Sequence, residues 1–77
     1  MYLYKVVIGD NQGSASVDSM NVKASSFGVA YAKATPELKK RTAQLHVEDQ
    51  KEKPEDRLPK SYAYTIEAIT NMTSIDL

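Results

Sequence analysis

The sequence predicts an α+β domain in which an antiparallel sheet of about four strands packs against one helix, in the order ββαββ. Two segments at opposite ends of the chain alternate apolar and polar residues, which is typical of half-buried strands. A segment between them carries apolar residues at helical spacing. A chain of 77 residues is long enough for one small domain, residues 1–77, with one sheet layer and one helix in its core.

The first predicted strand covers residues 2–8, and a turn over residues 9–13, which contains two glycines, follows it. The closing strand covers residues 61–70. In each strand one face carries tyrosines followed by apolar residues: Tyr2, Tyr4, Val6 and Ile8 in the first, and Tyr62, Tyr64, Ile66 and Ala68 in the last. These matched faces predict that the two strands are neighbours and that the tyrosine face lies under the helix.

The second strand has two alternative extents. Val17 falls on the opposite face from the apolar residues that follow it. A strand over residues 14–23 therefore needs a bulge near Asp18 or Ser19, because one extra residue restores the phase. The alternative is a shorter strand over residues 19–23 after a longer loop.

The helix is predicted to begin after Ser25 or Ser26, since serine is a favourable N-cap. Its apolar stripe is expected to face the core and consists of Phe27, Ala30, Tyr31 and Ala34. Pro36 lacks the backbone N–H that a helix interior needs. It therefore predicts either a kink or a new helical start, because proline is also favourable in the first turn.

Residues 42–49 fit two templates. Ala43, Leu45 and Val47 alternate with polar residues, which predicts a strand. The same residues are good helix formers, and a helix over residues 36–53 is the alternative. We prefer the strand because strict alternation is the better match. His46 then lies on the polar face of this strand and is expected to face solvent.

Charge is concentrated in one part of a neutral chain. The chain has ten basic and ten acidic residues, and thirteen of these twenty lie between Glu37 and Lys60. Residues 50–60 are predicted to form a solvated connection. Long charged loops on a rigid scaffold are common recognition sites, so the predicted partner-binding residues are Lys39, Lys40, Arg41, Lys53, Arg57 and Lys60.

The sequence offers no recognisable set of catalytic residues. The chain has one histidine and no cysteine, so we expect no enzyme, no metal site and no cofactor. Glu67 is expected to pair across strands with Lys5. We also expect no signal peptide and no membrane span. The lack of cysteine suits a reducing compartment, so we expect a cytoplasmic protein.

The chain resembles small phage-encoded accessory proteins, among them some anti-CRISPR proteins, in the order hairpin, helix, hairpin. The matching features are the alternation over residues 2–8, the Lys23-Ala24-Ser25-Ser26 segment before an alanine-rich helix, and the alternation over residues 43–47. The resemblance implies a non-enzymatic protein that inhibits a host macromolecular complex, in the host cytoplasm, by occupying a subunit surface or a nucleic-acid path.

Nucleic-acid binding is the alternative function. Aromatic residues on a sheet face can stack single-stranded bases. The strand tyrosines would supply that face, and the Lys39-Lys40-Arg41 triplet would contact phosphates. Both features also have plainer interpretations, as core residues and as a solvated helix face.

Self-association is predicted from the face opposite the tyrosines. Leu3, Val7 and Ile69 fall on that face, and contiguous exposed apolar residues mark contact sites. We expect either a homodimer through this face or a cover formed by Ile75 and Leu77 of the C-terminal tail.

Overall fold

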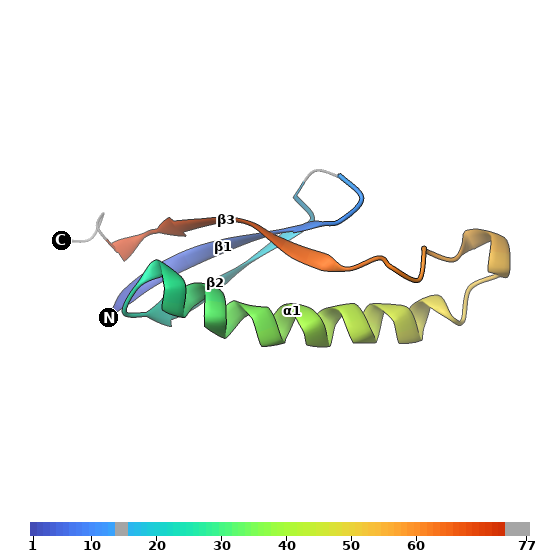
Figure 1. Ribbon diagram of the computed structural model, residues 1–77, viewed down its shortest axis with the longest axis horizontal. Coiled ribbons are helices and arrows are strands. Elements are labelled where there is room, and N and C mark those ends of the chain that lie inside the picture. Colours follow the sequence, from blue (N-terminus) through green and yellow to red (C-terminus); the bar gives the residue numbers. More distant parts are fainter. Residues whose placement is uncertain (14–15, 74–77) are drawn as a thin grey trace.

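The computed structural model describes residues 1–13 and 16–73. Its elements are β1 (Tyr2–Asp10), β2 (Asp18–Ala24), α1 (Phe27–Asp49), a 3-10 turn η1 (Pro54–Asp56) and β3 (Tyr64–Asn71). In the described residues the sheet is antiparallel with strand order β2-β1-β3, and α1 lies across one face of it (Figure 1). The predicted α+β class is confirmed. The fourth strand and the ββαββ order are wrong, because the observed order is ββαβ.

The missing strand is the second half of α1. Residues 42–49, which we predicted as a strand, are helical, and α1 runs for 23 residues without interruption. Three polar residues of this segment, Thr42, His46 and Asp49, lie about one helical turn apart and bind backbone groups of the chain that returns toward β3. The three bonds are Tyr64 N–H to Thr42 Oγ1 (3.1 Å), His46 Nε2 to the Tyr62 carbonyl (2.7 Å), and Leu58 N–H to the Asp49 carboxylate (3.0 Å).

His46 is therefore half-buried, and the expectation that it faces solvent is wrong. A carbonyl oxygen can only accept a hydrogen bond, so Nε2 of His46 carries the proton and donates it. The sequence pattern could not reveal this role, because the group that His46 binds is a main-chain carbonyl sixteen residues away.

The N-terminus of α1 follows the prediction. Ser26 is the N-cap, and its hydroxyl accepts the Val29 N–H at 3.2 Å. Pro36 lies inside the helix, which neither ends nor restarts there. The hydroxyl of the preceding residue, Thr35, donates to the Tyr31 carbonyl one turn earlier at 2.9 Å. This is a common local bond of threonine in helices.

The core lies between the sheet and the first half of α1. Its buried residues are Tyr4, Val6 and Ile8 of β1, Val22 and Ala24 of β2, and Ala30, Ala34 and Leu38 of α1. The prediction that β1 turns its tyrosine face to the helix is thus confirmed for Tyr4. Ala30 and Ala34 are 0% exposed, so the helix backbone approaches the sheet closely.

Phe27 and Tyr31, however, are 53% and 55% exposed, and their prediction as core residues is wrong. The two alanines occupy the stripe nearest the sheet, which leaves the larger aromatic side chains of α1 at its margin. The Phe27 ring still contacts the ring of Tyr4, with centroids 4.9 Å apart.

A bulge interrupts β3 and not β2. The register between β1 and β2 is regular from Tyr2–Ala24 to Ile8–Asp18, so β2 agrees with the alternative of a shorter strand and not with a bulge near Asp18 or Ser19. Between β1 and β3, Val7 pairs with Ala68 whereas Ile8 pairs with Ile66, which leaves Glu67 as the extra residue.

The bulge reverses the phase of β3 beyond Glu67. Ile69 pairs with Val6 and packs against the core cluster, so it lies on the helix side and not with Leu3 and Val7 as predicted. A bulge cannot be recognised from alternation within one strand, because both phases of residues 64–69 contain apolar side chains.

Glu67 itself lies over Gly9, with its Oε2 only 2.9 Å from where a Cβ at that glycine would stand. Lys5 pairs with Thr70 on β3 instead. The expected Lys5–Glu67 ion pair is absent from the described residues.

The open face of the sheet now has a smaller apolar surface than predicted. Leu3 and Val7 are half-buried and remain on it, while Ile69 has moved to the other side. Ile75 and Leu77, the alternative cover, lie outside the described residues. A homodimer through Leu3 and Val7 stays a prediction.

Candidate binding groove

A groove of about 530 Å³ runs between α1 and the outer edge of β3. The helix supplies one wall with side chains spaced along a single face, and the first three residues of β3 with the residue before them supply the other. The lining consists of Tyr31, Thr35, Leu38, Lys39, Thr42 and Ala43 from α1, and Ala63, Tyr64, Thr65 and Ile66 from the opposite wall. We call this site the seam groove.

The seam groove is mostly apolar and carries one charge. Lys39 is the only charged residue among the described residues that line it. Leu38 and Ile66 provide aliphatic surface, and Tyr31 provides an exposed aromatic ring. Phe27 lies one helical turn before Tyr31 on the same side of α1, so the two rings extend the apolar surface beyond the groove.

The backbone of β3 is open on the groove side. Met72 N–H donates to the Leu3 carbonyl at 2.8 Å, and Asn11 N–H donates to the Ala63 carbonyl at 3.1 Å. The alternation of an antiparallel ladder then directs the N–H and C=O groups of Tyr64 and Ile66 away from β1. Thr42 accepts the Tyr64 N–H, and Ile66 presents its backbone groups at the free edge.

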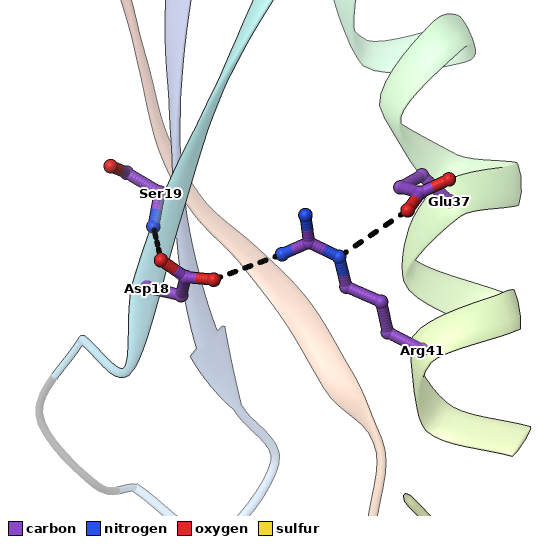
Figure 2. Close-up of polar contacts among 4 residues, drawn as sticks. All are labelled: Asp18, Ser19, Glu37 and Arg41. Atoms are coloured by element: carbon purple, nitrogen blue, oxygen red, sulfur yellow. Dashed lines mark hydrogen bonds and ion pairs between the residues drawn. The ribbon is translucent and has the colours of Figure 1, made fainter. Parts of the chain in front are cut away.

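At the opposite edge of the sheet, side chains bind two backbone groups of β2. On β2, the Lys33 ammonium donates to the Lys23 carbonyl at 2.8 Å, and the Asp18 carboxylate accepts the Ser19 N–H at 2.8 Å. Figure 2 shows that Arg41 of α1 reaches the same aspartate, at 3.1 Å. Charged groups on an edge strand oppose pairing with another strand, so the two edges differ in accessibility.

The six predicted partner-binding residues separate into three groups. Arg41 is held by Asp18 and by Glu37, at 3.1 and 3.4 Å, and Arg57 donates to the carbonyls of Glu52 and Gln50, both at 3.1 Å. Lys39 lines the seam groove. The other three are exposed at separate places: Lys40 on α1, and Lys53 and Lys60 on either side of η1.

Distance also separates these cations. Lys39 and Asp49 are ten residues apart on α1, which corresponds to about 15 Å along the helix axis. Lys53 and Arg57 lie farther along the chain. The far end of the molecule, which projects past the sheet in Figure 1, therefore carries its cations apart from the groove. Only Lys39 of the predicted set belongs to the site that the structure forms.

Of the four tyrosines predicted on the sheet face, Tyr2 is 43% exposed and the other three are buried or half-buried. Tyr4 is 2% exposed beneath the helix. Tyr62 and Tyr64 are half-buried and meet edge to face, with ring centroids 6.0 Å apart. The Tyr62 hydroxyl donates to Asp10 at 2.8 Å, which fixes this ring against the end of β1. The geometry therefore weighs against base stacking on these residues.

The bond between Tyr62 and Asp10 has a measurable consequence. Hydrogen bonding to the aspartate, together with burial, raises the pKa of the Tyr62 phenol to about 12. Because this pKa is raised above the unfolded value near 10, the interaction stabilises the fold fully below about pH 10, and this stability is lost as the pH rises through about 12.

We expect one of the five tyrosines to ionise late in a spectrophotometric titration, near pH 12. Tyr62→Phe should remove that late phase, since it deletes the phenol and retains the ring. Tyr2→Phe is the control, and it should leave the late phase in place. A late phase that survives Tyr62→Phe would assign it to another residue.

The preferred strand over residues 42–49 excludes this groove, which needs residues 36–49 to continue α1. Tyr31, Leu38 and Thr42 share a face only when α1 continues through Pro36. Once that continuation is accepted, the spacing of seven and then four residues is the available signal. The exposure of Tyr31 has no such signal, since it depends on how closely the alanines approach the sheet.

Two other features are lacking in the described residues. No group of three or more histidines, cysteines or carboxylates is arranged to hold a metal ion there. Within the same part of the chain, none of the helices has the length and apolar character needed to cross a membrane. Comparisons of the chain with protein-family models, curated proteins and solved structures gave no match.

Proposed function

We propose that this chain is a non-enzymatic binding protein that inhibits a macromolecular complex by occupying one of its surfaces. The observation that carries this is the seam groove, where apolar side chains, the exposed Tyr31 ring and an open strand edge meet. Tyrosine is enriched among the residues that dominate binding energy at protein interfaces. Apolar grooves beside open edges are also a recurring site of peptide recognition.

The resemblance to small phage-encoded accessory proteins gives this proposal its biological setting. Such proteins act by binding, so the partner would be a host protein or nucleoprotein complex in the host cytoplasm. Direct binding to nucleic acid is the less favoured alternative, because Tyr4 is buried and Arg41 is held by two carboxylates.

Affinity capture from a bacterial lysate tests the binding function. We expect the tagged protein to retain a partner in stoichiometric amount at low salt, before and after nuclease treatment. Retention of nucleic acid alone would support the alternative, as would affinity that falls steeply with salt. Failure to retain any protein or nucleoprotein under these conditions would count against the function itself.

Two variants connect the captured partner to the groove. Ala43→Arg places a long side chain in the seam groove, and Ala32→Arg places the same side chain on α1 at an exposed position outside the lining. Both substitutions suit a helix. We expect the first variant to lose the partner and the second to keep it, with circular dichroism confirming that both retain helix content.

A further inference from the structure

Building on the binding function proposed above, we infer that the seam groove accepts an extended segment of the partner that pairs its backbone with β3 at Ile66. The segment directs an apolar side chain between Leu38 and Ile66 and a carboxylate toward Lys39. The occupant is therefore an acidic, strand-forming peptide segment, and the chain adds it to its own sheet.

Within the groove lining, backbone pairing is possible at a defined place. Ile66 directs its N–H and C=O to the free edge, whereas the N–H of Tyr64 is already bound by Thr42. The bulge at Glu67 breaks the alternation on the other side of Ile66. A long uninterrupted strand cannot follow this edge, so the added segment is short and centred on Ile66.

The apolar walls of the groove favour an apolar side chain in the bound segment. Strand residues alternate in direction, so every second side chain of an added segment points toward α1. On that side it meets Leu38 and Ile66, with Tyr31 beside them. The volume of about 530 Å³ is in the range of pockets that hold several side chains or a small ligand.

The positive charge of Lys39 favours an acidic residue in the bound segment. Of the described residues that line the groove, Lys39 is the only ionic one, so its ammonium group has no carboxylate beside it there. Glu37, the nearest acid along α1, accepts from Arg41 at 3.4 Å on another side of the helix. A carboxylate of the partner is the group that complements this site.

A second copy of the chain is a poorer occupant. Two-fold pairing of β3 with itself would bring a second β3 and a second Lys39 to the same seam. The single carboxylate of β3 is that of Glu67, and it lies over Gly9, a residue of the strand phase that faces away from α1. The copy would therefore supply like charge and no complementary carboxylate on the groove side.

The test uses random heptapeptides displayed on phage and selected on the immobilised full-length protein. We expect enriched sequences that combine an acidic residue with a large apolar residue. Synthetic versions should protect the Ile66 amide from hydrogen exchange, as a new backbone hydrogen bond requires. Ala43→Arg should weaken their binding at least about tenfold, and Lys39→Glu about fivefold.

Matched controls are Ala32→Arg and Lys40→Glu, which make the same changes at exposed sites of α1 outside the groove lining. Both should leave the affinity within about twofold. Enriched peptides without carboxylates, or peptides that bind Ala43→Arg equally well, would overturn the inference. So would selection of no sequence above the Ala43→Arg background.

Two further measurements separate other occupants. A dimer in sedimentation that Ala43→Arg dissociates would assign the groove to a second copy. Changes in the NMR chemical shift of the Ile66 amide on addition of oligothymidylate would assign the groove to nucleic acid. Either result would overturn the inference that a peptide segment occupies the groove. If the Ala43→Arg variant still retains a partner from the lysate, the proposed binding function is supported but the seam groove is not its binding site. Failure of the function and failure of the groove inference are therefore distinguishable.

Discussion

Ile8→Ala is expected to lower the free energy of unfolding by about 3 kcal/mol, since removing a buried isoleucine side chain leaves a cavity in addition to the lost apolar burial. Ile8 is 1% exposed, and it is one of the two largest fully buried side chains. A domain of this size has a total stability of roughly 4 to 12 kcal/mol. The variant therefore loses a large share of its stability, and its Tm should fall by about 15 °C.

Val7→Ala is the matched control for this prediction. Val7 is the chain neighbour of Ile8, but its side chain lies on the open face of the sheet and is half-buried. Truncating it should cost about 1 kcal/mol or less. Urea unfolding followed by circular dichroism measures both losses, and equal losses would mean that the two faces of β1 are buried to the same degree.

The contrast between Ile8 and Val7 shows what could be predicted from the sequence. In β1 one face is more apolar than the other, and the neighbouring strand β2 follows in regular register. Local pattern and tertiary packing agree there, so the buried face of β1 was predictable. A serine N-cap at position 25 or 26 was equally predictable, because the bond of the observed cap, Ser26, to Val29 is made within one helical turn.

The errors occur where a distant backbone group decides the outcome. Thr42 and His46 look like the polar face of a strand, because the backbone groups that they bind belong to the returning chain about twenty residues later. The bulge at Glu67 likewise depends on the pairing of β3 with β1 and not on β3 alone. Such interactions join residues that are far apart in the sequence, and a periodicity within one segment does not contain them.

The seam groove could not be predicted, because it depends on both features that the sequence pattern did not indicate. Its walls require α1 to continue beyond Pro36, and its open edge requires β3 to be the last strand of the sheet. With a fourth strand at residues 42–49, Lys39 and Tyr31 would not share a surface with Ile66. The charged loop predicts the six basic residues as a binding surface, but neither charge nor loop length indicates that Arg41 and Arg57 bind groups within the fold.

Pro36→Ala is expected to raise the free energy of unfolding by about 2 kcal/mol. Proline in a helix interior costs about 3 kcal/mol, because it lacks the N–H that would bind the carbonyl four residues earlier and its ring crowds that carbonyl. At position 36 that carbonyl belongs to Ala32, and α1 continues for thirteen residues beyond the proline. The lost rigidity of the unfolded chain offsets about 0.4 to 1 kcal/mol of the gain.

The side chain of Pro36 is exposed, so its replacement removes little packing and the backbone effect should dominate. Pro54→Ala is the control, since Pro54 begins the short turn η1, where no helical hydrogen bond can be restored. Urea unfolding should show a higher midpoint for Pro36→Ala and an unchanged or slightly lower one for Pro54→Ala. A loss of stability in Pro36→Ala would show that the helix gains more from the fixed φ angle of proline than it loses through the missing hydrogen bond.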